Sequence, residues 1–410
     1  MTEVAPGSQP VDAPDPAVWP AELQLLLGED AAGILAVAAE TAGGELQSWR
    51  PRQVTHQPGR STVVQFRADV AWPDGHATSE TVVAATGARI PDGAAVLDDG
   101  TTKVAVWRWP IDPSLPGLAR ALDRDRITGL LDELGVDGGS IQLRVRAYRP
   151  GRRAVVEATG RRGRLFLKVV RPDRVEALHH THRSMSAALP VPDSLGWTDD
   201  GILVLPGLPG QTLRELLRSG RSQLPAPESI DALLDRLPAE LATGPRRRDL
   251  LTSAEHHAGV IASVQPALQG RLEDLLADLH GRDLLGHELV PVHGDLYEAQ
   301  LLVDRGELTG LLDVDTAGSG CRVEDIANLS AHLSVLALMS DRPKVIKRYG
   351  AAVLAHAEAH VDRADLRARI AAAVIGLGTG PFRVLEAHWP QATARRVDLA
   401  AEWLDGAERR

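Results

Sequence analysis

The spacing of hydrophobic residues changes from a two-residue period in the first half of the chain to a helical period in the second half. From Trp49 onward, β-branched and aromatic runs such as Thr81–Ala85 and Val104–Trp109 are separated by Gly and Asp-Gly turns. Such runs predict a small antiparallel sheet. The Ala-rich apolar stretch before them, over residues 21–42, predicts a helix.

A second group of strands is predicted after a Pro- and Gly-rich interruption at residues 112–117. Helical spacing is expected over residues 118–134 and again over 173–189. Beyond Gln211 the pattern indicates helices, apart from a strand-like segment over residues 289–314. The predicted strands of the second group are Ile141–Tyr148, Ala154–Ala158, Leu165–Val170 and Gly201–Leu205.

This order of elements predicts an α+β fold with two lobes, a small β-rich one followed by a mainly helical one that contains an inserted hairpin. At roughly 150 residues per domain, the chain of 410 residues is long enough for two or three units. We expect a disordered tail over residues 1–18, an N-terminal α+β unit over 19–117, a β-rich lobe over 118–207 and a helical lobe over 208–410.

The two β-rich segments share a short sequence. The stretch Pro58–Gln65 resembles the stretch Pro150–Glu157, and both indicate two strands joined by a Pro-Gly-Arg turn. Two interpretations stay open. Pro-Gly-Arg is a common hairpin turn, or the two segments descend from a duplication.

Charge and cysteine content narrow the classes of partner. The net charge is −10, whereas a broad nucleic-acid surface needs a basic excess. The acidic balance favours neutral or cationic small substrates over polyanions. Cys321 is the only cysteine, which fits a reducing cytoplasm. The sequence contains no apolar run of about 18 residues, so no membrane span is predicted. The N-terminal stretch lacks the apolar core of a secretory signal.

Candidate chemistry concentrates in the strand-like segment. The sequence places Asp295 in a tight loop directly after a strand, and Gln300 follows in the same stretch. A hairpin that turns at Arg305–Glu307 then brings Asp313 back beside them. Two carboxylates and an amide carbonyl thus converge, which predicts an oxygen-lined Mg²⁺ site. Phosphoryl transfer needs such a metal site and a carboxylate beside the attacking hydroxyl.

This pattern resembles the catalytic motif of the aminoglycoside phosphotransferase and choline kinase superfamily, whose fold is related to that of protein kinases. The family pattern is His-Gly-Asp, four residues, Asn, and then a hairpin that ends in Ile/Leu-Asp-Phe. The resemblance implies that Asp295 is the catalytic residue, which orients the acceptor hydroxyl and takes its proton. It implies that Gln300 and Asp313 bind Mg²⁺ ahead of ATP. His293 would shape the loop, and Asp325 would hold it in place.

The resemblance covers about residues 140–335 and includes departures from the family pattern. Gln300 stands where most members have Asn, but maltokinase-type members also carry Gln there. The N-terminal unit is similar to the cap of that branch, and the following segments correspond to the kinase-like N-lobe and to a C-lobe with the catalytic and metal-binding loops. Val314 replaces the usual Phe, and Asp315 lies one residue nearer than the second acid of many relatives.

The resemblance also implies a nucleotide site upstream. Lys168 lies between apolar neighbours in a predicted strand and is the candidate contact of the α- and β-phosphates. Glu176 is the candidate partner of this lysine on the next helix, with a surface role at the helix N-terminus as the alternative. Gly151 and Arg152 lie in the turn expected to face phosphate, where the arginine is equally typical of a solvated turn. Leu205 lies in the predicted adenine-binding hinge.

We therefore expect an ATP-dependent small-molecule kinase that transfers the γ-phosphate to a hydroxyl of a sugar or an amino sugar. Two alternatives stay open: an antibiotic-modifying kinase of the aminoglycoside type, and a nucleotide-binding regulatory pseudokinase. The expected partners are ATP, Mg²⁺ and a small hydroxyl acceptor. Neither nucleic acid nor a membrane is expected as a partner. We predict a cytoplasmic monomer or homodimer.

Overall fold

A computed structural model describes residues 18–408, except residues 89, 137–138, 162, 222, 245, 248 and 283. The predicted disordered tail lies outside the described residues up to residue 17. None of the described helices combines the length and the apolar character that a membrane crossing requires.

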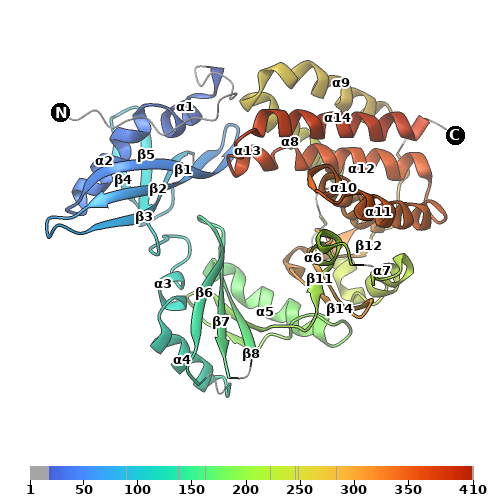
Figure 1. Ribbon diagram of the computed structural model, residues 1–410, viewed down its shortest axis with the longest axis horizontal. Helices are drawn as coiled ribbons and strands as arrows, with labels where there is room; N and C mark the ends of the chain where they lie inside the picture. Colours follow the sequence, from blue (N-terminus) through green and yellow to red (C-terminus); the bar gives the residue numbers. More distant parts are fainter. Residues whose placement is uncertain are drawn as a thin grey trace.

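The first part of the described chain is an antiparallel sheet covered by two helices (Figure 1). The predicted helix over residues 21–42 is interrupted at Gly28, where an added Cβ would lie 2.4 Å from the carbonyl oxygen of Gln24. Leu23, Leu35 and Phe66 are buried between the helices and the sheet. The elements are α1 (Ala21–Leu27), α2 (Asp30–Thr41), β1 (Glu45–Gln57), β2 (Ser61–Ala71), β3 (Ala77–Gly87), β4 (Ala95–Asp98) and β5 (Lys103–Arg108).

The second part is another antiparallel sheet with helices beside it. The predicted helix over residues 118–134 is broken because Asp123 caps the second piece and accepts hydrogen bonds from the N–H groups of Asp125 and Arg126. The elements are α3 (Leu118–Ala121), α4 (Arg124–Glu133), β6 (Gln142–Arg149), β7 (Arg153–Gly160), β8 (Gly163–Val170), α5 (Pro172–Ser186), β9 (Gly196–Trp197) and β10 (Ile202–Pro206).

The two sheets have the same topology. The strands of the first sheet are ordered β1-β2-β3-β5-β4, and those of the second sheet are ordered β6-β7-β8-β10-β9. In both sheets the first hairpin turns at a glycine with positive φ, +69° at Gly59 and +67° at Gly151. These are the glycines of the two Pro-Gly-Arg turns. The shared strand order favours a duplication over a chance likeness between two turns.

The third part is mainly helical, and the predicted strand-like segment forms short strands within it (Figure 1). Its helices are α6 (Leu213–Ser219), α7 (Pro227–Leu234), α8 (Leu250–Val264), α9 (Gln269–Gly281), α10 (Arg322–Met339), α11 (Pro343–Glu358), α12 (Arg363–Leu377), α13 (Gly380–Arg383) and α14 (Trp389–Glu408). Its strands are β11 (Gln211–Thr212), β12 (Val290–Val292), β13 (Leu301–Asp304), β14 (Glu307–Leu311) and β15 (Gly318–Gly320). The β-rich N-terminal region and the helical C-terminal part confirm the predicted α+β class.

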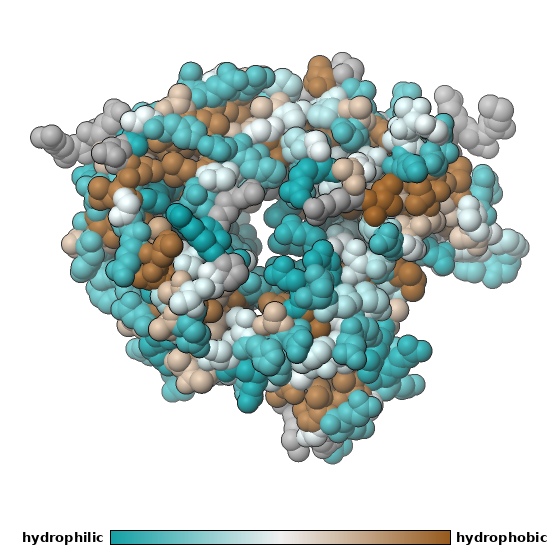
Figure 2. All heavy atoms as spheres, turned by 180° about the vertical axis from the view of Figure 1, so that it is seen from behind, coloured by the Kyte–Doolittle hydropathy of each residue, from teal (hydrophilic) through white to brown (hydrophobic). Residues whose placement is uncertain are grey.

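The first part contacts both of the others. Towards the helices, the rings of Trp19 and Phe382 lie edge to face with centroids 6.0 Å apart, and the Trp19 indole donates to the carbonyl of Val264 at 3.1 Å. Towards the second sheet, the rings of Trp109 and Tyr148 have centroids 4.6 Å apart. The three parts surround a central opening that is bordered mainly by hydrophilic atoms (Figure 2).

Candidate active site

The loop after β12 holds Asp295 in a fixed position. The carboxylate of Asp325, near the start of α10, accepts hydrogen bonds from the backbone N–H groups of His293 at 2.7 Å and Gly294 at 2.8 Å. Gly294 has φ +78°, and an added Cβ would lie 2.5 Å from the carbonyl oxygen of Thr316. Only glycine fits this turn without strain. The loop is therefore built by Gly294 and by a buried carboxylate behind it.

His293 joins this loop to the segment that carries Asp313. Its Nε2 lies 2.9 Å from the carbonyl oxygen of Leu312, and its Nδ1 lies 3.3 Å from the backbone nitrogen of Asp295. Because a carbonyl only accepts, Nε2 carries the proton and Nδ1 accepts from the Asp295 N–H. The hydroxyl of Thr316 also donates to the carbonyl of His293 at 3.0 Å. These bonds fix the position of Asp295 relative to Asp313.

A cluster of two cations and two carboxylates lies where β7 and β8 face the β14 hairpin. Arg153 donates two parallel hydrogen bonds to the carboxylate of Asp313, both at 3.0 Å. The ammonium of Lys168 donates to Asp313 at 2.8 Å and to Asp315 at 2.5 Å. Burial alone would raise the pKa of Asp313, but Lys168 and Arg153 hold this pKa well below its usual range. The cluster therefore presents the ionised carboxylate of Asp313 together with positive charge.

Gln300 lies against the same carboxylate. Its amide nitrogen is 3.4 Å from Oδ2 of Asp313, and its side chain is almost fully buried. The backbone of Gln300 is fixed as well, because its carbonyl accepts from the N–H of Leu312 at 2.8 Å. The longer arm of Gln thus reaches Asp313, and the role of Gln300 as a metal ligand stays a prediction.

The residues present fit a Mg²⁺ ion. Asp313 offers carboxylate oxygens, which Mg²⁺ prefers. The amide of Gln300 faces Asp313 with its nitrogen, so it would turn over to present its carbonyl oxygen to the ion. The carboxylate oxygens of Asp313 are taken by the cationic groups of Arg153 and Lys168, which shows that this position favours positive charge. Asp313 itself has φ +55°, a left-handed conformation that is uncommon for a residue with a side chain and that is often found at functional sites.

On the other side of Asp295 lies a cavity of about 550 Å³. Burial raises the pKa of Asp295 to about 6, and the negative charge of Asp313 adds to this shift, while the nearby imidazole of His293 opposes it. The polar lining includes Arg149, Arg214, Arg247, Arg383, Asn328 and His332. Asp295 is thus the carboxylate at the junction between the charged cluster and the cavity.

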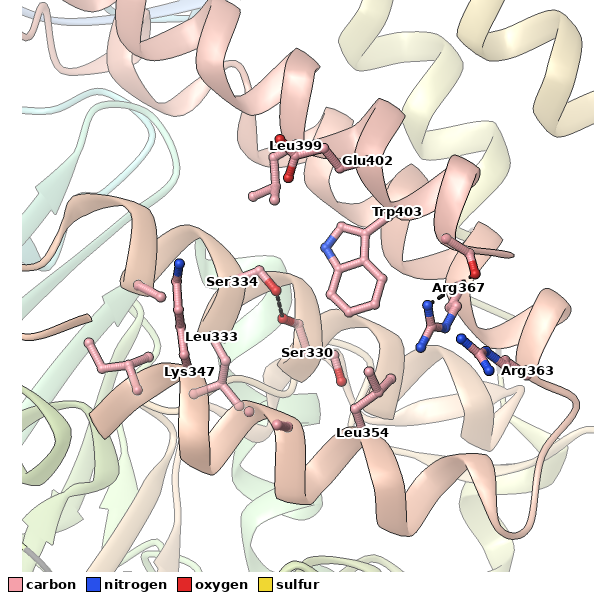
Figure 3. A pocket seen from close by; sticks show the side chains of 15 residues that line it. Ser330, Leu333, Ser334, Lys347, Leu354, Arg363, Arg367, Leu399, Glu402 and Trp403 are labelled. Atoms are coloured by element: carbon pink, nitrogen blue, oxygen red, sulfur yellow. Dashed lines mark hydrogen bonds between the residues drawn. The ribbon is translucent and has the colours of Figure 1, made fainter. Parts of the chain in front are cut away.

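A larger cavity of about 670 Å³ lies among α10, α11, α12 and α14 (Figure 3). Trp403 points into it, and Ser334 donates to the carbonyl of Ser330 at its wall. None of the predicted catalytic, nucleotide-binding or metal-binding residues is among the described residues that line it. The smaller cavity beside Asp295 is therefore the candidate acceptor site.

The structure brings most of the predicted site residues together, but the expected pair of Lys168 and Glu176 is not formed. The side chain of Glu176 is 68% exposed and lies 3.9 Å from His180 one turn along α5. The rotation of α5 turns His182 inward instead, and the pKa of this buried imidazole is lowered by burial and by the positive charge of Lys168. The prediction failed because eight residues after Lys168 the helix faces solvent.

The other predicted nucleotide residues lie around the second sheet. Gly151 is in the turn between β6 and β7, and its N–H donates to the carboxylate of Asp112. Arg152 is in the same turn and is exposed. Leu205 is buried in β10, opposite Phe166 of β8. Their predicted nucleotide contacts stay predictions.

Sequence reasoning did not select Arg153 or Asp315 as site residues, although both complete the charged cluster. Arg153 follows the predicted Arg152 directly, and it is the first residue of β7. Its partner Asp313 lies 160 residues further along the chain. The local signal was the Arg-Arg pair after Gly151, but the sequence alone does not show which of the two arginines faces the loop.

Comparison with known proteins places the chain among phosphotransferases. Residues 144–368 match the sequence model of APH, the phosphotransferase enzyme family. No curated protein sequence matches the chain at a significant level. The matched residues include the second sheet and the loop that carries Asp295.

Several solved structures resemble the fold. The apo form of a thermostable mutant of aminoglycoside phosphotransferase APH(4)-Ia is 14% identical, covers 68% of this chain and 99% of its own, and has a TM-score of 0.51. Choline kinase from Cryptosporidium parvum Iowa II is 13% identical, covers 69% and 96%, and has a TM-score of 0.48. Macrolide 2'-phosphotransferase MphH from Brachybacterium faecium is 22% identical, covers 70% and 99%, and has a TM-score of 0.42. The first of these comparisons supports the kinase-like fold.

Proposed function

Because the chain belongs to the phosphotransferase enzyme family, we propose that it transfers the γ-phosphate of ATP to a hydroxyl group of a small molecule, a sugar or an amino sugar. The observation that carries this proposal is the position of Asp295. It lies between a cluster of Lys168, Arg153 and Asp313 and a cavity large enough for a sugar. One side suits a nucleotide phosphate, and the other suits the acceptor.

The proposed step is direct in-line transfer. Asp295 accepts a hydrogen bond from the acceptor hydroxyl and takes its proton as the new O–P bond forms. The bond between the γ-phosphorus and the bridging oxygen breaks, and ADP leaves with the electron pair. The pKa of Asp295 is about 6, so this carboxylate is ionised at neutral pH. Its pKa also lies closer to pH 7 than the pKa of an exposed carboxylate, which makes it a better proton acceptor. Asp295 is therefore suited to the role of a general base.

Lys168 and Arg153 would neutralise the phosphates, since both are held at the carboxylate cluster by Asp313. Asp313 and Gln300 would hold Mg²⁺, which supplies positive charge to the phosphate oxygens when bound. The ordered set of Lys168, Asp295 and Asp313 supports catalysis over a purely regulatory role.

The cytoplasmic location and the state of assembly stay predictions from the sequence.

A sugar acceptor is supported by two features. Gln300 in the metal position is similar to the maltokinase-type branch, and the first sheet is similar in position to the cap of that branch. The cavity also has many hydrogen-bonding side chains, among them Asn328 and Arg214, as recognition of a polyhydroxylated molecule requires.

A coupled ADP-release assay with Mg-ATP tests the function against sugars with and without an acidic group, amino sugars, aminoglycosides, choline and homoserine. We expect an acceptor-dependent signal that Asp295→Asn reduces by about a hundredfold or more, because the base is lost. Asp304→Asn on the neighbouring β13 is the matched control, since Asp304 is exposed. A signal that persists in Asp295→Asn, or a flat panel despite nucleotide binding in a thermal-shift assay, contradicts the proposal.

A further inference from the structure

The charge of the cavity beside Asp295 differs from the charge of the whole chain. The net charge is −10, which favours neutral or cationic substrates when considered alone. The cavity nevertheless has arginines on several walls, from the end of β6, from α6, from the segment before α8 and from α13. Local side chains decide what a small ligand meets. The acceptor is therefore best inferred from the cavity itself.

Two carboxylates line the cavity besides Asp295, and the protein itself uses both oxygens of Asp325 but only one oxygen of Glu324. Asp325 uses both oxygens to hold the backbone of the loop that carries Asp295. Glu324 accepts from Arg369 at 3.1 Å and from the N–H of Leu250 at 3.2 Å. Among the described residues that line the cavity, Asp295 and one oxygen of Glu324 are left to bind a cation. An acceptor with several ammonium groups would meet positive charge and find few counter-charges.

Two of the four arginines are engaged by the protein. Arg214 donates to the buried carboxylate of Glu298 at 2.7 Å and lies over the ring of Tyr297. Arg247 donates to the carbonyl of Ala317 at 2.7 Å. Burial of His332 lowers its pKa to about 3, so this imidazole adds no positive charge at neutral pH.

Arg149 and Arg383 remain. Neither guanidinium has an ion pair or a hydrogen bond to any residue in the described part of the chain. They reach the cavity from different elements, Arg149 from the end of β6 and Arg383 from the end of α13. Burial lowers the pKa of Arg149, and repulsion from Arg153 and Arg383 adds to this shift. Two cations held close together without a counter-charge form a site that an anion would stabilise.

The phosphates of ATP could supply that anion, but the position of the cavity favours the acceptor. The described residues that line the cavity include none of Lys168, Arg153, Gln300 and Asp313. These residues mark the proposed nucleotide side of Asp295. Arg149 and Arg383 therefore face the space on the acceptor side.

Resting on the phosphotransferase function proposed above, we propose that the acceptor carries a carboxylate or a phosphate in addition to its reacting hydroxyl, and that Arg149 and Arg383 bind this anionic group. Carboxylates and phosphates are the planar or multidentate anions that guanidinium groups bind with paired hydrogen bonds. A sugar acid or a sugar phosphate fits this description, whereas an aminoglycoside or choline does not.

Calorimetry without nucleotide tests the anion site separately from catalysis. The probes are D-glucose, D-glucosamine, D-glucuronate and D-glucose 6-phosphate, which differ mainly in charge. We expect at least one anionic probe to bind about tenfold or more tightly than glucose, which corresponds to a single charged hydrogen bond. Glucosamine should bind no better than glucose. Anionic probes that bind no more tightly than glucose, including no binding by any probe, overturn the proposal.

Single-residue variants test whether Arg149 and Arg383 are the residues that bind the anionic group. Arg383→Gln and Arg149→Gln should each weaken the anionic probe about tenfold and leave glucose unchanged. Arg395→Gln, an exposed arginine of α14 that does not line the cavity, is the matched control. Arg383→Lys keeps the charge and should retain part of the affinity, while thermal melting checks that each variant is folded. An anionic probe that binds equally well to Arg383→Gln and Arg149→Gln overturns the proposal.

Steady-state kinetics separate the two sources of anion. With an anionic acceptor, Arg383→Gln should raise the KM of the acceptor about tenfold and leave the KM of ATP nearly unchanged. A raised KM of ATP with an unchanged KM of the acceptor would assign Arg383 to the nucleotide and overturn the proposal. If the anionic probes bind but no acceptor releases ADP, the anion site stands and the phosphotransferase function fails.

Discussion

The carboxylate of Asp112 accepts a hydrogen bond from the backbone N–H of Gly151 at 2.8 Å. The same carboxylate oxygen accepts from the hydroxyl of Tyr148, also at 2.8 Å. Asp112 follows the last strand of the first sheet and is almost fully buried, whereas Gly151 lies in the turn of the second sheet, two residues before Arg153. The first sheet thus connects to the turn that positions the arginines of the site.

This contact predicts a role for the N-terminal part in nucleotide binding. Asp112→Ala leaves the N–H of Gly151 without its acceptor and loosens the turn that carries Arg153. We expect the KM of ATP to rise about tenfold, with a smaller change in the KM of the acceptor. Tyr148→Phe removes the hydroxyl that bonds to Asp112 and to the indole of Trp107 but keeps the bond from Gly151 to Asp112, so the KM of ATP should change less in this variant. Equal KM values of ATP in Asp112→Ala and the parent protein would exclude this role.

Much of the geometry of the proposed catalytic segment could be predicted because this segment is local. Asp295, Gln300 and Asp313 lie in one loop and one hairpin, where their spacing along the chain fixes their separation in space. The residue types also limit the chemistry, since carboxylates with an amide carbonyl suit Mg²⁺ and phosphoryl transfer. The two-lobed α+β class followed from the change in hydrophobic period.

The residues that were missed depend on contacts between distant parts of the chain. Arg153 meets Asp313, and Arg383 meets the cavity, only after the sheets and the helices assemble. Glu176 was wrongly paired with Lys168 because the rotation of α5 is set by packing, which places His182 inside. The identity of the free arginines could not be predicted, because sequence does not reveal which cations already have partners.

The raised pKa of Asp295 predicts the pH dependence of catalysis. A general base must be ionised, and burial raises the pKa of Asp295 to about 6. We expect kcat/KM for the acceptor to be constant above this pH and to fall about tenfold per pH unit below it. A pH–rate profile with Asp304→Asn as the control checks this, and a profile that stays flat down to about pH 5 contradicts the assignment.

The same pKa predicts that Asp295 lowers stability at neutral pH. Its folded-state pKa of about 6 exceeds the ordinary value of 3.8, so the folded protein binds the proton more tightly than the unfolded chain. Stability therefore falls as pH rises from the lower value to the higher one, and the loss is complete above the folded-state pKa. Asp295→Asn should raise the free energy of unfolding by about 1–2 kcal/mol at neutral pH, after allowance for screening by solvent. Urea unfolding at a neutral pH and at an acidic pH below the folded-state pKa tests this prediction. A gain in the free energy of unfolding that is as large at the acidic pH as at neutral pH contradicts it.

The proposed metal site predicts different results for its two side chains. Asp313→Asn removes the negative charge that binds Lys168 and Arg153, so transfer of the γ-phosphate to the acceptor should be lost. Gln300→Ala removes a neutral ligand, and we expect the Mg²⁺ concentration for half-maximal activity to rise about tenfold. Titration of Mg²⁺ at saturating ATP measures both. Gln211→Ala in β11, where the glutamine is exposed, is the control. An unchanged Mg²⁺ requirement in Gln300→Ala would remove Gln300 from the site.

The bonds from Asp325 to the catalytic loop predict a combined loss of stability and turnover. Asp325 is buried and accepts from two backbone N–H groups, those of His293 and Gly294. Asp325→Asn keeps the shape of the side chain but turns one acceptor into a donor, which leaves one N–H facing an amide NH₂. Burial of these unpaired donors should lower the free energy of unfolding by about 2–4 kcal/mol.

Because Asp295 follows Gly294 directly, kcat should fall in Asp325→Asn even under conditions in which the protein is fully folded. The KM of ATP should change little, since Lys168 and Arg153 belong to the other lobe. Urea unfolding and steady-state kinetics, with Asp304→Asn as the matched surface variant, test both effects. A stable Asp325→Asn protein with normal kcat would show that other contacts set the position of Asp295. The hydrogen bonds of the His293 side chain would then be the next contacts to test by mutation.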